Sequence, residues 1–366
     1  MNTPASAKMT SLSLQPKIRS LLIVRMSAMG DIIHAMPAVA ALREVYPTAT
    51  IGWVVEERWA ELLSSARSCS GSATGRRLAD KIHIVNTKKW RTAVTSSATR
   101  QEITKVVKEL RAMEYEAAVD FQGLIRSAVL ANLSGAKTIY GYAQPRERAA
   151  RIFYTKQVAA RGEHIVEKNL SLAESVVDRK LTAAPSDLPT DEIAEKDSER
   201  WLHEHEINNF VILNPGAGWA SKQWPPERYG GLAKDLGHVG FKSLINAGPG
   251  EQTLAQTVKA TSEGTAEIVE CSIPQLIAFT RRASLFVGGD TGPIHLAAAL
   301  GVPVVAIFGP TNPARNGPYG TRSIVLRSPS SQTNHSQRAQ LDPGLLEISS
   351  EEVFAASQNL LGAARG

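Results

Sequence analysis

Two stretches far apart in the chain have the residue types and the spacing of a ligand-binding site. The first, residues 27–31 (SAMGD), follows an apolar run short enough for a buried parallel strand and precedes apolar residues at helical spacing. The second, residues 288–295 (GGDTGPIH), also lies between a predicted strand and a predicted helix. In open α/β sheets ligands bind at the carboxyl ends of the strands, so both turns are expected to line a binding cleft.

The second stretch favours an anion. Its Asp290-Thr291-Gly292 sequence precedes a helix, whose first N–H groups and positive dipole end attract phosphate. Lys222 follows a glycine-rich turn and can supply a cation to a diphosphate. Glu251, after a predicted strand, can accept hydrogen bonds from ribose hydroxyls, although an ordinary helix-start glutamate explains it nearly as well. The residues predicted to line the second-half wall of the cleft are Lys222, Gly218, Glu251, Asp290, Thr291, Gly292 and His295.

The positive charge lies in the first half of the chain. Residues 1–180 hold 27 Lys and Arg against 16 Asp and Glu, whereas residues 181–366 hold 14 against 19. An anionic partner bound by the first half fits this asymmetry, and a solvated basic surface fits it about equally well. Several basic residues fall just after predicted strands or at helix starts. The residues predicted to face the cleft from the first half are Lys88, Lys89, Arg91, Gln122, Arg126, Arg146 and Arg148.

Strand-like and helix-like segments alternate along the chain and predict two doubly wound α/β domains that face each other across a cleft. Residues 309–345 are expected to be mostly loop, because they are rich in Pro, Ser, Asn and Gly. The predicted organisation is a disordered start (1–17), a first domain (18–181), a linker (182–193), a second domain (194–345) and a C-terminal helix (346–366).

Composition excludes several classes of protein. The chain is 43% hydrophobic and 21% charged, and no apolar run is long enough to span a membrane. The start lacks the apolar segment of a signal peptide, and Cys69 and Cys271 have no metal-ligand spacing, so a cytoplasmic protein is expected. A pI of about 9.3 suggests nucleic-acid binding, but no helix-turn-helix, zinc or RNA-recognition signature supports that remote alternative.

With both halves placed, the chain resembles the heptosyltransferases of glycosyltransferase family 9, inverting enzymes that build the inner core of lipopolysaccharide. The type I enzymes, which add the first heptose to the Kdo of lipid A, are the most similar. The matching segments are residues 25–31 (RMSAMGD), 53–57 (WVVEE), 120–124 (DFQGL), 146–148 (RER), 222–225 (KQWP), 290–292 (DTG) with His295, and 308–311 (FGPT).

The resemblance implies a GT-B fold, an ADP-heptose donor and a Kdo-lipid A acceptor. It makes the second domain (194–345) nucleotide-sugar-binding, so that the seven second-half residues named above would bind the donor. It makes the first domain (18–181) acceptor-binding, so that the seven first-half residues would bind the acceptor with its Kdo carboxylates and lipid A phosphates. It also implies no metal or other cofactor and a peripheral position at the cytoplasmic face of the inner membrane. Inverting transfer needs a base for the acceptor hydroxyl, and Asp31 is the candidate. A helix-capping aspartate is the competing interpretation. A structural role is expected for the neighbouring His34.

One difference from the type I pattern leaves the identity of the donor open. Ala217 and Gly218 stand where type I enzymes often have two threonines, so backbone N–H groups would have to replace two hydroxyls. A heptosyltransferase II, or another GT-B nucleotide-sugar enzyme such as an epimerase, remains the alternative.

Overall fold

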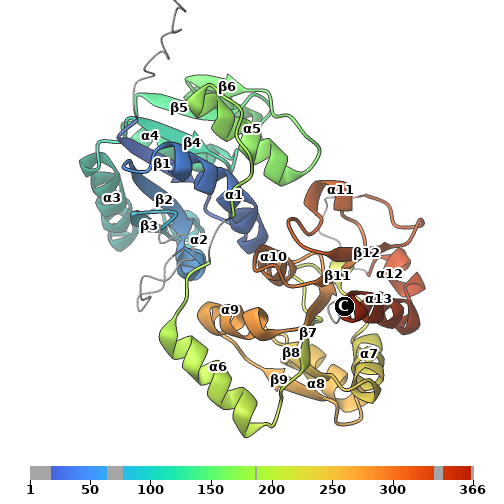
Figure 1. Ribbon diagram of the computed structural model, residues 1–366. Coiled ribbons are helices and arrows are strands. Elements are labelled where there is room, and N and C mark those ends of the chain that lie inside the picture. Colours follow the sequence, from blue (N-terminus) through green and yellow to red (C-terminus); the bar gives the residue numbers. More distant parts are fainter. Residues whose placement is uncertain (1–17, 64–76, 186–187, 334–340, 364–366) are drawn as a thin grey trace, which may run out of the picture.

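The computed structural model describes residues 18–63, 77–185, 188–333 and 341–363. These form two α/β halves (Figure 1). The predicted disordered start lies outside the described residues.

The first half is built on a six-stranded parallel sheet with the order β3-β2-β1-β4-β5-β6. Helices α1 and α5 cover one face of the sheet, and α3 and α4 cover the other. The strands are β1 (Ser20–Val24), β2 (Thr50–Glu56), β3 (Lys81–Val85), β4 (Ala117–Asp120), β5 (Thr138–Tyr142) and β6 (Lys156–Val158). The helices are α1 (Met29–Val45), α2 (Thr87–Thr92), α3 (Ser97–Ala112), α4 (Ile125–Leu133) and α5 (Ile165–Val177), with 3-10 turns η1 (Glu57–Leu62) and η2 (Arg148–Phe153).

The second half repeats this topology, with the sheet order β12-β11-β10-β7-β8-β9. Its strands are β7 (Phe210–Asn214), β8 (Lys242–Asn246), β9 (Ala266–Val269), β10 (Leu285–Gly289), β11 (Val304–Phe308) and β12 (Ser323–Arg327). Its helices are α6 (Glu192–Glu204), α7 (Pro226–His238), α8 (Gln252–Thr261), α9 (Ile273–Arg282), α10 (Gly292–Ala299), α11 (Pro313–Asn316), α12 (Pro343–Glu347) and α13 (Ser350–Gly362), with the 3-10 turn η3 (Ala220–Lys222). The predicted C-terminal helix is α13, and it packs against α7 and the second sheet.

Both sheets therefore have the doubly wound order in which a switch point lies beside the first strand. The central strands β1, β4, β7 and β10 are buried throughout and mostly apolar, because a parallel sheet is covered on both faces. The fold prediction is confirmed. As predicted, the described residues of 309–345 are mostly loop, although they also contain β12, α11 and the start of α12.

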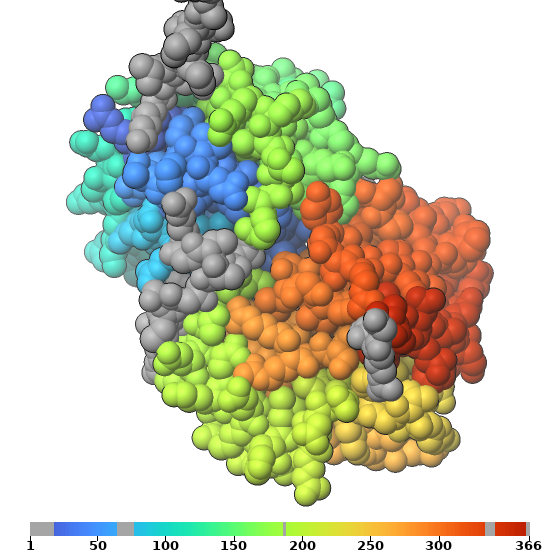
Figure 2. Space-filling model, in the orientation of Figure 1, coloured from blue at the N-terminus to red at the C-terminus, as the bar shows by residue number. Residues whose placement is uncertain are grey.

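The two halves pack directly on each other (Figures 1 and 2). Helix α1 lies against α10, and Leu276, Ile277 and Leu296 of the second half are part of the same buried apolar cluster as the core around α1. At the tightest point, a Cβ on Gly30 would lie 2.5 Å from the ring of His295. Only glycine at position 30 allows the start of α1 to approach the second half this closely.

Candidate functional site

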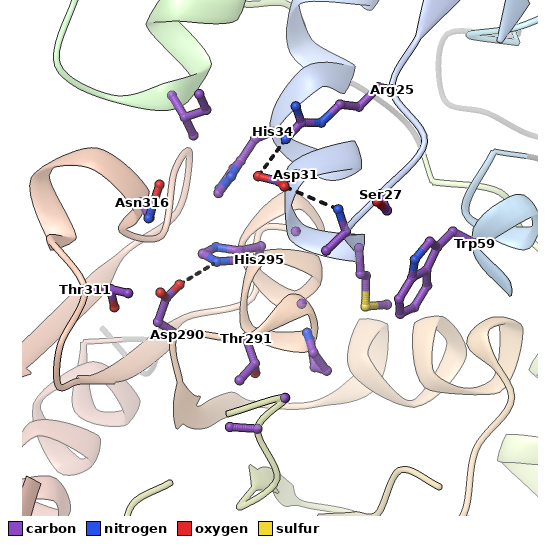
Figure 3. A pocket seen from close by; sticks show the side chains of 18 of the residues that line it. Arg25, Ser27, Asp31, His34, Trp59, Asp290, Thr291, His295, Thr311 and Asn316 are labelled. Atoms are coloured by element: carbon purple, nitrogen blue, oxygen red, sulfur yellow. Dashed lines mark hydrogen bonds and ion pairs between the residues drawn. The ribbon is translucent and has the colours of Figure 1, made fainter. Parts of the chain in front are cut away.

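A cavity of about 1290 Å³ lies between the two halves, at the facing carboxyl ends of their strands. That volume exceeds the usual range for a single small ligand, so the cavity has room for a nucleotide sugar and part of an acceptor. The β1–α1 turn of the first half and the β10–α10 turn of the second half face each other across it (Figure 3). These are the two stretches in which the sequence predicts a binding cleft.

Asp31 lines the cavity from the first turn of α1. Its Oδ1 lies 2.7 Å from Nη2 of Arg25, and its Oδ2 accepts a hydrogen bond from the N–H of Ala28 at 3.3 Å. The Asp31 side chain is 36% exposed, whereas that of Arg25 is only 7% exposed. Asp31 therefore has both properties that the sequence suggests. Its carboxylate receives the backbone N–H that precedes α1, and it remains open to the cavity.

Arg25 and Gln122 fix the turn that carries Asp31. Arg25, at the end of β1, donates through Nη1 to the carbonyl of Phe121 at 2.5 Å. Gln122 accepts hydrogen bonds from the N–H groups of Met26 and Ser27 at 3.0 and 3.2 Å. Gln122 also lines the cavity, so the residue that holds this turn is part of the cavity wall.

Lys222, Asp290 and His295 form a linked group in the second half. Nζ of Lys222 lies 2.7 Å from Oδ2 of Asp290, and Nε2 of His295 lies 3.1 Å from Oδ1 (Figure 3 shows the second contact). Burial raises the pKa of Asp290, but the hydrogen bond from His295 and the charge of Lys222 outweigh it and hold the pKa below its usual value. Asp290 is therefore an anion that positions a cation and an imidazole at the cavity wall.

Three histidines meet where α1 approaches α10. The His34 ring centroid is 4.3 Å from that of His295 and 5.5 Å from that of His164. Burial holds the pKa of His34 well below its usual value, and the neighbouring His295 and His164 lower it further. Nε2 of His34 and Nδ1 of His295 are buried without a hydrogen-bond partner among the described residues. Both residues line the cavity, so a bound ligand or water is needed to satisfy these atoms.

The remaining donor-side residues gather at the ends of β7, β8 and β10. Glu251 accepts from the N–H of Gly248 at 2.8 Å, and its carboxylate occupies the space that a Cβ on Gly216 would fill. Asn214 donates to the hydroxyl of Thr291 at 3.3 Å. All seven residues predicted to bind the donor line the cavity, namely Gly218, Lys222, Glu251, Asp290, Thr291, Gly292 and His295.

The residues predicted to bind the acceptor divide into two groups. Gln122, Arg126 and Arg146 line the cavity. Lys88, Lys89, Arg91 and Arg148 are exposed and are not among its lining residues. Lys88, Lys89 and Arg91 lie on α2, which follows the edge strand β3, and Lys89 is paired with Glu102 at 2.8 Å.

Sequence reasoning missed several cavity residues. Arg25, Lys168 and Arg315 line the cavity, but the sequence predicts no role for any of them. Arg25 belongs to one of the segments that resemble the family. The position of Arg25, directly after a buried strand and six residues before Asp31, was a signal that could have found it. No such local signal exists for Lys168 and Arg315, which reach the cavity through the packing of α5 and α11.

Among residues 18–63, 77–185, 188–333 and 341–363, no cluster of three or more His, Cys, Asp or Glu side chains is suited to hold a metal ion. None of the helices in these same ranges has the length and apolar character needed to cross a membrane.

Comparisons with known proteins agree on one family. The profile described as "Glycosyltransferase family 9 (heptosyltransferase)" matches residues 103–343. Lipopolysaccharide heptosyltransferase 1 of Pseudomonas aeruginosa is 27% identical over 314 residues, which cover 84% of this chain and 83% of that protein.

Solved structures give the same result. E. coli heptosyltransferase WaaC with ADP-2-deoxy-2-fluoro heptose is similar with a TM-score of 0.72 and 25% identity, over 93% of this chain and 99% of that one. E. coli ADP-heptose lps heptosyltransferase II is similar with a TM-score of 0.75 and 18% identity, over 95% of this chain and 100% of that one. The second likeness concerns the fold alone.

Proposed function

Because this chain belongs to glycosyltransferase family 9 (heptosyltransferase), it is a glycosyltransferase, and we propose that it moves L-glycero-D-manno-heptose from ADP-heptose to the Kdo of Kdo-lipid A, with inversion at the anomeric carbon. The relative named lipopolysaccharide heptosyltransferase 1 and the solved enzyme with an ADP-heptose analogue support this choice.

One observation carries the proposal. A carboxylate from the first half and a cation at a helix start from the second half face the same cavity. Asp31 is the carboxylate, and Lys222 stands beside the first turn of α10. Inverting transfer needs a proton acceptor on one side of the sugar and charge stabilisation for the leaving group on the other.

In the proposed reaction, the acceptor hydroxyl gives its proton to the carboxylate of Asp31 as its oxygen bonds to the anomeric carbon of the heptose. The bond between that carbon and the diphosphate oxygen breaks, and the electron pair leaves with ADP. Lys222 and the N–H groups at the start of α10 stabilise the negative charge that develops on the diphosphate. Glu251 is placed to accept hydrogen bonds from the ribose.

The acceptor is assigned to the first half. Gln122, Arg126 and Arg146 are proposed to bind its carboxylates and phosphates, since guanidinium groups form paired hydrogen bonds with both. Lys88, Lys89, Arg91 and Arg148 are proposed to contact more distant phosphates of the same lipid. This acceptor would place the protein in the cytoplasm, at the inner face of the inner membrane.

The proposed reaction uses no metal ion and no cofactor. Lys222 and the positive end of the α10 dipole would stabilise the leaving diphosphate in place of a divalent cation. ADP-heptose is then a substrate that is consumed at each turnover.

The test is a transfer assay with ADP-heptose and two acceptors. One acceptor is Kdo-lipid A, and the other already carries one heptose. Transfer to the first acceptor alone supports the proposal. Transfer only to the second would make the chain a heptosyltransferase II, and conversion of the nucleotide sugar without an acceptor would indicate an epimerase. Replacement of ADP-heptose by UDP- and GDP-sugars tests whether the enzyme requires the ADP group of the donor.

A further inference from the structure

We propose that one exposed surface of the first half docks on an anionic lipid bilayer. This surface, the η2 patch, consists of Arg126, Arg146, Arg148, Arg151, Ile152 and Lys156. The inference rests on the proposed function, because a lipid-linked acceptor explains why such a surface borders the cavity. It adds the place on the molecule at which the bilayer is contacted.

The η2 patch is held together by backbone contacts between segments distant in sequence. The N–H of Glu147 donates to the carbonyl of Gly123 at 3.0 Å, and the carboxylate of Glu147 accepts from the N–H of Ile125 at 2.7 Å. The start of α4 and the 3-10 turn η2 therefore lie side by side. The exposed cations and Ile152 therefore belong to segments that contact one another, directly or through β5.

The cations of the η2 patch keep N–H donors for phosphates, although Nε of Arg151 already donates to Oε1 of Gln157 at 3.0 Å. Arg126, Arg146, Arg148, Arg151 and Lys156 are all exposed, and none of them forms an ion pair with another described residue. The one acidic residue among them, Glu147, is occupied by the N–H of Ile125. The patch thus presents net positive charge, and each basic residue close to an anionic leaflet strengthens adsorption.

An exposed apolar side chain stands among these cations. Ile152 is 82% exposed, which is more than any other large hydrophobic residue in the described ranges, and Ile125 nearby is 42% exposed. Transfer of an exposed isoleucine from water to the boundary between headgroups and acyl chains is favourable, because it removes apolar surface from water. A nucleic-acid surface would use the arginines but would leave Ile152 in water.

The η2 patch is continuous with the catalytic cavity. Arg126 and Arg146 belong to the patch and also line the cavity. A headgroup that remains in the bilayer can therefore reach the cavity from this side without extraction of its acyl chains. One apolar side chain with a few cations gives weak, reversible adsorption, which suits an enzyme that must release each product.

The experiment is flotation of the full chain with vesicles that contain neither donor nor acceptor. Binding is expected to phosphatidylcholine vesicles that contain phosphatidylglycerol, with little binding to phosphatidylcholine alone and a marked loss at high salt. Arg151→Gln/Lys156→Gln is expected to weaken binding about 25-fold, or about fivefold per charge. Ile152→Ser is expected to weaken it about tenfold.

Matched controls lie elsewhere on the surface. Lys105→Gln/Lys108→Gln removes two exposed cations from α3, and Ile193→Ser removes an isoleucine that is 45% exposed on α6. Both controls should bind like the wild type. Absence of wild-type binding to anionic vesicles, or an equal loss in the controls and the patch variants, would overturn the inference.

Transfer to a deacylated, water-soluble acceptor separates this inference from the proposed function. Arg151, Ile152 and Lys156 do not line the cavity, so their variants should keep wild-type turnover on that acceptor. A wild type that floats but transfers no heptose would reject the proposed function and leave the docking surface. A wild type that transfers heptose but does not float would reject the docking surface and leave the proposed function.

Discussion

Nη2 of Arg25 lies 2.7 Å from Oδ1 of Asp31, and the two residues belong to the same strand-to-helix turn. The arginine is almost fully buried, while the carboxylate faces the cavity. Arg25 therefore anchors Oδ1 of Asp31, the N–H of Ala28 contacts Oδ2, and the partly exposed carboxylate still lines the cavity. A carboxylate held in this way is oriented for proton transfer at the same time as it supports the start of α1.

Asp31→Asn is expected to lower turnover by roughly two to four orders of magnitude, because the amide cannot accept the acceptor proton. Donor affinity should change little, since the donor residues lie in the second half. Loss of the ion pair to buried Arg25 should also cost about 1–2 kcal/mol of unfolding free energy, a value reduced because Asp31 is partly exposed. Turnover, donor affinity and melting temperature measure the three effects.

Asp80→Asn is a matched control for Asp31→Asn. Arg43 is buried and pairs with Asp80 at 2.6 Å, and Asp80 is 45% exposed, so the pair resembles Arg25–Asp31 outside the cavity. Asp80→Asn should lower stability by a similar amount and leave turnover intact. Comparable loss of turnover in both variants would show that Asp31 acts through stability alone.

Lys222→Ala is expected to reduce transition-state stabilisation by roughly 2–4 kcal/mol, because it removes a cation next to the leaving diphosphate. It also leaves buried Asp290 without its lysine, so the melting temperature should fall. The double variant Lys222→Ala/Asp290→Asn removes the unpaired charge and should regain stability while turnover stays low. Turnover within a factor of about two of wild type in Lys222→Ala would rule out the assigned role.

Much of the fold could be predicted because the central strands are continuous apolar runs and the helices between them have regular apolar spacing. The elements that were missed lack these signals. Strand β12 lies at a sheet edge, within a segment rich in Pro, Ser, Asn and Gly, and β6 has only three residues. Helix α2 has no buried residue, so no apolar periodicity marks it.

The two sides of the site differed in how well they could be predicted. The donor-side residues lie in the loops and helix starts that follow strands of the second sheet, and this position brings them to the cavity. For the acceptor side, the excess of Lys and Arg in the first half predicts an anionic partner. It does not predict which of these side chains line the cavity. Lys89 is paired with Glu102, while Lys168 and Arg315 reach the cavity from α5 and α11. The approach of His34 to His295 depends on how the two halves pack, which no local pattern encodes.

Transfer is expected to persist in excess EDTA. The positive charge for the diphosphate would come from Lys222 and the first turn of α10, neither of which is removed by a chelator. The assay compares initial rates with and without EDTA, and Lys222→Ala serves as a control that lacks one of the two sources. Complete loss in EDTA, restored by Mg²⁺, would show that a metal ion takes part.

Stability is expected to fall as the pH is lowered from about 6.5 toward 4, because buried histidines resist protonation in the folded chain. Burial lowers the pKa of His83 to about 4, and His34 and His164 also have pKa values below the usual one. The unfolded chain takes up protons near pH 6.5 while the folded chain does not, so the stability present above that pH is lost on acidification. For His83 alone the full loss is about 3 kcal/mol. His83→Gln keeps a possible hydrogen bond to Tyr115 and should give a flatter plot of melting temperature against pH. An equally steep plot for this variant would show that His83 does not contribute to the pH dependence of stability as expected.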